Sequence, residues 1–422
     1  MGYFTALSEL DAECASFAGG KGAMLGELIK RKGGLTHPTE VPSGTVLCKE
    51  AFEEWMQSAG VTDSGITAAL NSIGKDTKKL EQVVGLLHGK LAATPIPEKV
   101  VLDLLQFKQG PLAVRSSGIG EDGGISSFAG QHDTILNCTD IPKGVKDVWL
   151  SAFNPRALYY RVTKDMTSTP IRQAVVIQEM VKPTIAGVAF SADPRSGDRK
   201  TAMVEYVQGL GDKLVSGEVT PKRLLIGHDD ITATGNLHVV AKTVVELEHM
   251  FGWPVDMEWA WDNKLFMLQA RPITALPKAY DPALIEKIKY EHEVYGLPIM
   301  MGERLAPGTI GAAGFITREQ CHYALEHPDN PKGYSALSKR ILLVPFTTPD
   351  DLPWMEKVAG IVVDEGGITS HAAIVCRELG KPCIKVDDIA KIEHSRDGYS
   401  QEYTLMDGDI GALYKAGIEV VL

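Results

Sequence analysis

The sequence lacks several features that would assign it to a class at once. It has no apolar run long enough to span a membrane, and its N-terminus has no basic segment followed by an apolar one, as a secretory signal would. Acidic residues outnumber Lys and Arg by 54 to 43, which argues against a surface for nucleic acid or an anionic membrane. The six cysteines form no CxxC pair, which argues against structural zinc or a disulfide framework. We therefore expect a cytoplasmic protein with neither a nucleic-acid nor a membrane partner.

A chain of 422 residues predicts two or three domains. Residues 1–275 mix helical periodicity with short strands bounded by turn residues, which favours an α+β domain over regular parallel winding. Residues 276–302 carry prolines around a charged, helix-like middle and are predicted to be a linker, and residues 303–422 are predicted to form a small α/β domain. The fold class expected is thus an α+β / α/β multidomain protein. The clearest helix candidates are residues 22–32, 49–58 and 78–92, and the clearest strand candidates are residues 113–116, 174–180, 187–191, 265–269, 341–344, 359–363 and 382–386.

The most informative segment is Gly366-Gly367-Ile368-Thr369-Ser370-His371. Ser370 is a plausible N-cap and Gly380 a plausible C-terminal stop, so a helix is predicted to begin at His371. A helix N-terminus favours an anion, which suits a histidine that carries a phosphoryl group without a metal at that point. The alternative is a histidine that caps the helix or fills the core.

Two other segments combine flexible backbone with a cation. Lys21 lies in the run Gly19-Gly20-Lys21-Gly22, and Arg115 ends a predicted strand before a serine- and glycine-rich loop. Glycines allow the backbone to approach a ligand closely, and the two cations can bind phosphate oxygens. Neither segment matches the GxxxxGK[ST] phosphate loop. A plain turn before a helix and a surface loop with a salt-bridged arginine are the structural alternatives.

A predicted hairpin near residue 262 carries four polar side chains. Asp256 and Glu258 alternate along one strand, so they face the same side, and Gln269 and Arg271 do the same on the next strand. Two carboxylates, an amide oxygen and a guanidinium on one face suit a magnesium triphosphate, because the oxygens can bind the metal and the cation the phosphates. The alternative is a solvated polar face of a hairpin.

Together these segments give the chain a clear resemblance. It resembles the phosphoenolpyruvate synthase and pyruvate phosphate dikinase superfamily, in the two-module arrangement also seen in rifampin phosphotransferase. The resemblance covers nearly the whole chain in the family's order. Further matching segments are residues 151–157, 178–181, 187–194, 205–211 and 215–221.

The resemblance implies a fold and a set of site residues. The first part would be an ATP-grasp nucleotide-binding domain of the dikinase type, and the second a swivelling phosphohistidine domain with His371 as the phosphorylated residue. Magnesium would be the metal cofactor, held by Glu258 and Gln269. The catalytic residues implied are His371, Arg271, Lys21 and Arg115, and the ATP-binding residues are Lys21, Arg115, Ser116, Gln131, Gln178, Glu179, Val181, Glu258, Gln269 and Arg271.

The implied activity is that of a phosphotransferase with paired acceptors. The β-phosphoryl group of ATP would move to His371 and then to a small-molecule acceptor, with release of AMP and phosphate. We expect neither the barrel domain that follows the histidine domain in the synthase nor the acceptor-binding domain of the rifampin enzyme. The alternatives are one subunit of a larger phosphotransferase whose partner carries the acceptor site, or a non-catalytic nucleotide-sensing subunit. A partner subunit or a homodimer is the expected assembly.

Overall fold

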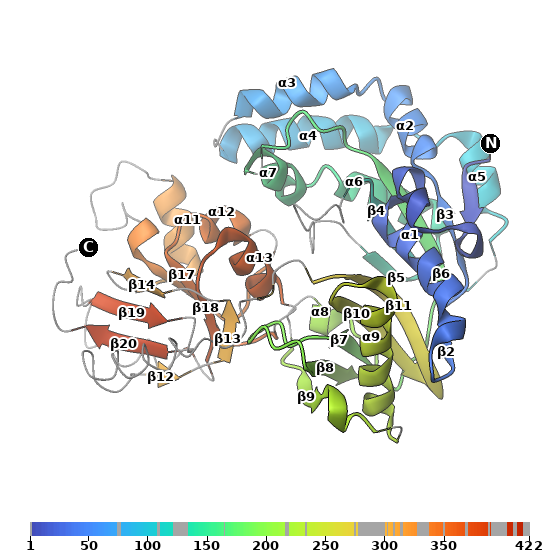
Figure 1. The fold of residues 1–422 in the computed structure, drawn as a ribbon. Coiled ribbons are helices and arrows are strands. Elements are labelled where there is room, and N and C mark those ends of the chain that lie inside the picture. Colours follow the sequence, from blue (N-terminus) through green and yellow to red (C-terminus); the bar gives the residue numbers. More distant parts are fainter. Residues whose placement is uncertain are drawn as a thin grey trace. The chain divides into compact units, whose positions relative to one another are not determined.

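The computed structural model divides the chain into two compact units that are not continuous in sequence (Figure 1). The first unit contains Met1–Ala189, Gln208–Leu210 and Thr232–Thr274, and the second contains Phe190–Val207, Gly211–Ile231 and Ala275–Leu422. The residues described are 2–73, 77–107, 110–120, 134–163, 165–215, 219–232, 234–273, 276, 300–301, 303–306, 309–312, 315–326, 337–348, 351–367, 370–386, 389, 403–407 and 412–416.

An antiparallel sheet of five strands forms the centre of the first unit. Its order is β1 (Phe4–Ala6), β3 (Gly44–Leu47), β6 (Gln173–Glu179), β4 (Leu112–Gly118) and β5 (Thr134–Cys138). The central strand β6 is buried along all but its last residue, and its middle four residues are apolar on both faces. Helix α1 (Ala15–Arg31) packs against β4 and β6 (Figure 1).

The described part of this unit has six further helices before residue 164. They are α2 (Lys49–Ser58), α3 (Asp63–Ile73), α4 (Thr77–Ala93), α5 (Glu98–Leu104), α6 (Ile141–Ser151) and α7 (Pro155–Thr163). Of these, α2 and α6 pack on the sheet. The aromatic rings of Trp55 and Trp149 stack at 5.2 Å between α2 and α6, and the Phe52 ring lies 6.0 Å from that of Phe153. Burying such large side chains is a strong apolar contribution, so these rings anchor the helices to one another.

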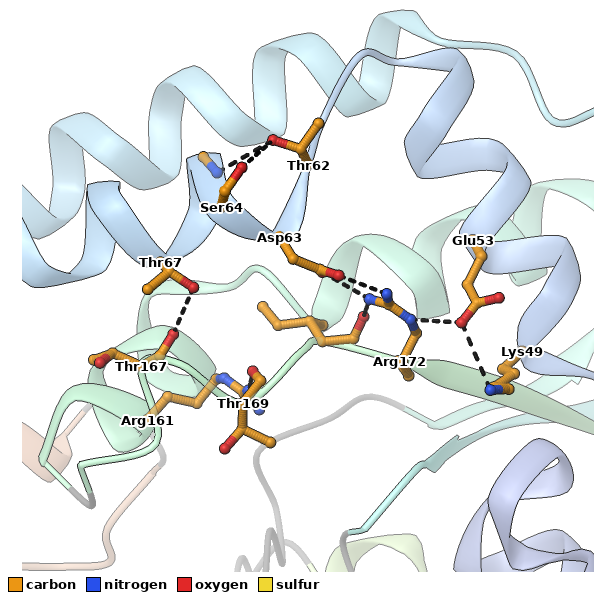
Figure 2. Close-up of polar contacts among 12 residues, drawn as sticks. Lys49, Glu53, Thr62, Asp63, Ser64, Thr67, Arg161, Thr167, Thr169 and Arg172 are labelled. Atoms are coloured by element: carbon orange, nitrogen blue, oxygen red, sulfur yellow. Dashed lines mark hydrogen bonds and ion pairs between the residues drawn. The ribbon is translucent and has the colours of Figure 1, made fainter.

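An ion-pair network ties the helices to the start of β6 (Figure 2). Arg172 donates to both carboxylate oxygens of Asp63, at 2.8 and 2.6 Å, and through Nε to Oε1 of Glu53 at 2.6 Å. Its backbone carbonyl accepts from the N–H of Ile119 at 3.0 Å. The fork of the guanidinium thus joins α2 and α3 to the start of β6, and the Arg172 carbonyl bonds the residue that follows β4.

The second sheet of this unit carries the predicted polar hairpin. Strand β10 (Val255–Asp262) pairs antiparallel with β11 (Lys264–Pro272), which pairs in parallel with β2 (Thr39–Glu40). Strand β7 (Ile185–Phe190) is the neighbour of β10, and helix α9 (Asn236–Phe251) packs on β10 and β11.

The second unit contains a mainly parallel sheet. Its order is β13 (Glu303–Ala306), β18 (Cys383–Lys385), β17 (Gly360–Val363), β16 (Ile341–Val344) and β15 (Phe315–Ile316), with only β13 antiparallel. Its described helices of four or more residues are α8 (Asp212–Val215), α11 (Arg318–Glu326), α12 (Leu352–Met355) and α13 (His371–Leu379).

Two antiparallel groups complete the described part of this unit. One is a four-stranded sheet in the order β12 (Met300–Met301), β20 (Ala412–Ala416), β19 (Tyr403–Asp407) and β14 (Thr309–Ala312). The other is the pair β8 (Thr201–Gln208) and β9 (Lys222–Gly227). Met406 of β19 packs in one apolar cluster with Leu343, Val362 and Ile384, so the four-stranded and parallel sheets share a core.

The predicted mixed multidomain fold with several sheets is confirmed. Helix α2 and strand β16 have the bounds that the sequence predicts. Helix α1 begins at Ala15, seven residues before the predicted start, because a kink at Gly19 joins two helical segments. The helix-like middle of residues 276–302 lies outside the described residues, and the domain bounds 1–275, 276–302 and 303–422 stay a prediction. Across the described ranges, no helix has both the length and the apolar character of a membrane span.

Candidate functional site

The polar residues of the β10–β11 hairpin lie opposite one another, as strand alternation predicts. Asp256 pairs with Arg271 and Glu258 with Gln269, and the ladder shifts register immediately after Glu258. Nε of Arg271 donates to Oδ2 of Asp256 at 2.8 Å. Asp256 and Gln269 are buried, and Glu258 and Arg271 are half-buried. A local irregularity of this kind re-aims side chains, which is common beside functional sites.

Arg115 joins this hairpin to the first sheet. Its guanidinium Nη2 donates to Oε2 of Glu258 at 2.6 Å and to Oε1 of Gln269 at 2.9 Å, while Nη1 donates to the Leu268 carbonyl at 2.6 Å. The whole residue is only 8% exposed. The side-chain oxygens of Glu258 and Gln269 therefore converge on one cationic group. Such oxygens are also the ligands that a hard cation such as Mg²⁺ prefers. The two residues predicted as metal ligands fit that role.

Lys21 stands immediately after a sharp break in α1. Gly19 has φ of +72°, a left-handed conformation that glycine adopts without steric cost. The hydroxyl of Ser117, from β4, accepts from the N–H of Gly22 at 3.1 Å and donates to the carbonyl of Ala18 at 2.7 Å. The structure thus brings the lysine segment to the strand that carries Arg115.

The other predicted nucleotide residues have different surroundings. Ser116 is buried on the face of β4 opposite to Arg115, because side chains alternate along a strand. Gln178 is also buried, and its Nε2 donates to the carbonyl of Pro42 at 3.1 Å. Glu179 is exposed at the end of β6 and Val181 is half-buried just after it. Gln131 lies outside the described residues.

His371 begins helix α13, as predicted. Ser370 is the N-cap, with its hydroxyl accepting from the N–H of Ala373 at 3.4 Å, and the helix ends at Gly380 in the left-handed conformation. His371 is 6% exposed, and its Nδ1 lies 2.9 Å from Oγ1 of the buried Thr347. The Thr347 hydroxyl therefore forms a hydrogen bond with one ring nitrogen of His371. The tautomer of the ring depends on whether the hydroxyl donates or accepts this hydrogen bond.

Sequence reasoning missed Thr347. It lies 24 residues before His371, three residues after strand β16 ends. Polar residues beyond the carboxyl ends of neighbouring parallel strands gather at one edge of a sheet. That topological rule, applied to predicted strands 341–344 and 359–363, is the signal that could have found it.

The glycine pair before His371 fits against a buried ion pair. A Cβ added to Gly367 would lie 2.9 Å from Oε2 of Glu205 and 3.0 Å from Cγ of Pro221. The Glu205 carboxylate is fully buried and accepts from Nε of Arg223 at 3.0 Å. Gly366 has φ of +107°. A side chain is therefore sterically excluded at position 367 and conformationally disfavoured at position 366.

The cysteines near His371 are poor candidates for chemistry. Burial raises the pKa of the Cys383 thiol well above its ordinary value, with the hydrogen bond to Cys376 as the next cause. Burial also raises the pKa of Cys321 to about 12. Thiols with such high pKa values stay protonated near neutral pH, and the thiolate is the reactive form. Cys383 and Cys321 are therefore unsuited to act as nucleophiles.

Comparison with known families identifies two domains along the chain. Residues 15–236 and 231–292 match the pyruvate phosphate dikinase AMP/ATP-binding domain, and residues 337–411 match the mobile domain of PEP-utilising enzymes. These two domains in this order define the class of PEP-utilising dikinases. The chain belongs to the pyruvate phosphate dikinase and phosphoenolpyruvate synthase family.

Curated relatives carry the synthase name. The chain is 32% identical to a probable phosphoenolpyruvate synthase of Archaeoglobus fulgidus, over 98% of this chain and 58% of the relative. It is 28% identical to the phosphoenolpyruvate synthase of Pyrococcus furiosus, over 96% of this chain and 58% of the relative. The chain thus spans less than two thirds of the length of these relatives.

Solved structures resemble the chain only distantly. An ATP citrate lyase from Methanothrix soehngenii is 8% identical, with 71% of this chain and 90% of that chain covered and a TM-score of 0.21. The N-terminal domain of Enzyme 1 – Nitrogen is 13% identical, with 28% of this chain and 93% of that chain covered and a TM-score of 0.19. TM-scores this low leave the fold to be described from the chain's own elements.

Proposed function

We propose that this chain is an ATP-dependent dikinase-type phosphotransferase that works through a phosphohistidine. Nε2 of His371 attacks the β-phosphorus of ATP, and the bond to the oxygen shared with the α-phosphate breaks, which releases AMP. Water or phosphate then removes the γ-phosphoryl group and leaves the β-phosphoryl group on the ring. The observation that carries the proposal is that one chain of this family combines two features. Arg115 lies against the side-chain oxygens of Glu258 and Gln269, and His371, which forms a hydrogen bond with Thr347, begins a helix.

The nucleotide is assigned to the first unit, as an ATP-grasp domain. Lys21 and Arg115 bind phosphate oxygens, and Arg271 contacts the phosphoryl group in transfer, because each carries a cation that matches phosphate geometry. The adenine is assigned to the segment from Gln178 to Val181. The buried Gln178 amide already donates to Pro42, so it acts there by shaping the backbone of this segment.

Magnesium fits the oxygens that Arg115 contacts. Glu258 and Gln269 would hold the ion, since a side-chain oxygen of each lies within 2.9 Å of the same guanidinium nitrogen, Nη2 of Arg115. Bound with ATP, the metal would neutralise phosphate charge.

Thr347 directs the chemistry of the histidine. With Nδ1–H donated to Oγ1 of Thr347, the lone pair lies on Nε2, which is the nitrogen that attacks. The N-terminus of α13 stabilises the phosphoryl group that follows, because a helix start favours negative charge.

The final acceptor is proposed to be a small molecule. Pyruvate is the first candidate to test, because the curated relatives bear the name phosphoenolpyruvate synthase. An acceptor site on a partner subunit is the second candidate arrangement, since the chain spans 58% of those relatives. An acceptor screen that measures AMP release, with and without candidate partner proteins, separates the two.

Labelled ATP tests the proposal directly. The protein is incubated with Mg²⁺ and ATP carrying the label at either the β or the γ position, and AMP is quantified in parallel. We expect stable protein-bound label from the β position, with AMP formed in proportion. A protein that binds ATP but forms no AMP with any acceptor or partner would be a nucleotide-sensing subunit instead.

A further inference from the structure

A hydroxyl from a distant strand caps the helix that follows Gly19. The break at Gly19 starts a new helical segment, and the first N–H groups of any helix lack partners four residues earlier. The residue at the break normally supplies a side-chain oxygen for one of them. Glycine has no side chain, and Ser117 supplies the oxygen that accepts from the third residue, Gly22, which lies 95 residues before it.

The same hydroxyl also closes the other side of the break. The Ser117 hydroxyl donates a hydrogen bond to the carbonyl of Ala18, the last residue before the kink, at 2.7 Å. Ser117 is 0% exposed, so neither contact can be replaced by solvent. A Cβ at Gly19 would overlap the backbone and side chain of Ser117. Ser117 therefore excludes any residue larger than glycine at position 19.

The position of Lys21 follows from these two hydrogen bonds. Lys21 lies between Gly19, where the backbone turns, and Gly22, where it is anchored. Arg115 lies two residues before Ser117 on the same face of β4. One strand thus carries one cation and, through a hydroxyl, fixes the backbone that carries the other.

We propose that Ser117 is a positioning residue of the nucleotide site, and that its hydroxyl sets the direction of Lys21 relative to Arg115. This inference rests on the proposed function, because it assigns Lys21 and Arg115 to the phosphates of ATP. Ser117 itself need not touch the nucleotide. It acts by holding a backbone whose displacement would move a phosphate-binding cation.

Nucleotide binding by the full chain tests this role. The dissociation constant of Mg-ATP is measured by calorimetric titration for the wild type and for Ser117→Ala, Lys21→Ala and the double variant. Ser117→Ala and Lys21→Ala are each expected to weaken binding about tenfold. The double variant is expected to be weakened by clearly less than the product of the two changes, because the serine acts through the lysine.

A matched buried serine controls for simple destabilisation. Ser151 is 1% exposed, and its hydroxyl donates to the carbonyl of Val148 at 2.7 Å, within α6. Ser151→Ala is expected to lower the urea midpoint of unfolding like Ser117→Ala while leaving the dissociation constant unchanged. If Ser117→Ala yields too little folded protein, Ser117→Cys places a somewhat larger thiol, which is a weaker donor, at the same position, and an intermediate dissociation constant is expected.

The outcomes separate the inference from the proposed function. If the wild type does not bind ATP, the proposed function fails and this inference fails with it. If the wild type binds ATP and Lys21→Ala weakens binding, an unchanged dissociation constant in Ser117→Ala or Ser117→Cys overturns the inference alone. The inference is also overturned if the fold-changes in the dissociation constant of the two single variants multiply in the double variant. Such independence would show that Ser117 acts on ATP binding without acting through Lys21.

Discussion

The cation cluster around Arg115 and the loop before His371 are built in contrasting ways. The cluster joins β4, β10 and β11 by side-chain hydrogen bonds between residues more than 140 positions apart in sequence. The loop depends on glycines that fit against a buried ion pair, on an N-cap, and on one hydroxyl at Nδ1. Directional polar bonds suit a site that holds a charged ligand in place. A loop shaped by steric fit instead fixes the backbone that leads to His371, the residue proposed to receive the phosphoryl group.

The largest effect is expected at the cluster, for Arg115→Ala. The change removes the cation shared by Glu258 and Gln269 and leaves a half-buried carboxylate without its partner, at a cost of about 3 kcal/mol in the free energy of unfolding. AMP formation should fall by at least about 100-fold. Urea unfolding and initial rates measure the two effects. Arg115→Lys keeps the charge without the fork and should be intermediate, whereas a fully active Arg115→Ala would remove the cluster from the proposed site.

The loop predicts a different pattern for Gly367→Ala. The new Cβ would lie within 3.0 Å of Glu205 and Pro221, so the backbone before His371 must shift. Phosphorylation of His371 should slow about tenfold. The dissociation constant of ATP should not change, because the cation cluster belongs to the other unit.

A glycine with open space around it serves as the control. A Cβ at Gly85 in α4 would meet nothing within 4 Å, so Gly85→Ala should leave labelling unchanged and slightly stabilise the helix. Equal labelling rates in Gly367→Ala and Gly85→Ala would contradict the steric account of the loop.

A smaller effect is expected for Thr347→Val. The change keeps the shape of the side chain but removes the hydroxyl at Nδ1 of His371. Loss of one hydrogen bond of ~1 kcal/mol should slow phosphorylation about fivefold. Thr347→Ser retains the hydroxyl and should label at nearly the wild-type rate. A rate for Thr347→Val equal to that of Thr347→Ser would show that the hydroxyl does not direct the ring.

The smallest effect concerns the ion pairs that hold the helices to the first sheet. The hydrogen bond from Arg172 lowers the pKa of Asp63, so the contribution of this pair is present above the unfolded-state pKa, roughly 3.9. It is lost as pH falls through the lower folded-state pKa. Asp63→Asn should cost about 1 kcal/mol at pH 7, because the pair is partly exposed. Urea unfolding at pH 7 and in acid, below the folded-state pKa, measures the difference in the free energy of unfolding between the wild type and Asp63→Asn. This difference should be smaller in acid, and an equal difference at the two pH values would contradict the assignment.

Local patterns in the sequence predicted those parts of the site that local geometry determines. Alternation placed Asp256 with Glu258 on one face, and caps located the start of α13 at His371. The hydroxyl of Ser117 and that of Thr347 were missed, because each acts on a residue distant in sequence. Periodicity reports which face a side chain takes, but the neighbour on that face depends on sheet order and register.

The kink in α1 has the same explanation. A turn before a helix at residue 22 is one interpretation of the glycines around Lys21, but no local pattern predicts the helical segment that precedes Gly19. The break is specified by the contact with Ser117, which belongs to a strand beginning almost a hundred residues later. Steric exclusion at Gly367 likewise depends on Glu205, whose burial no local pattern reveals.

The central claim is that His371 receives a phosphoryl group from ATP, and mass spectrometry tests it most directly. The full chain is mixed with Mg²⁺ and ATP, quenched in alkali to preserve phosphohistidine, digested and mapped. The account predicts one phosphoryl group on the peptide that contains His371, absent from His371→Ala although that variant still binds ATP. An unmodified His371 at every quench time, with ATP bound and AMP formed, would contradict it.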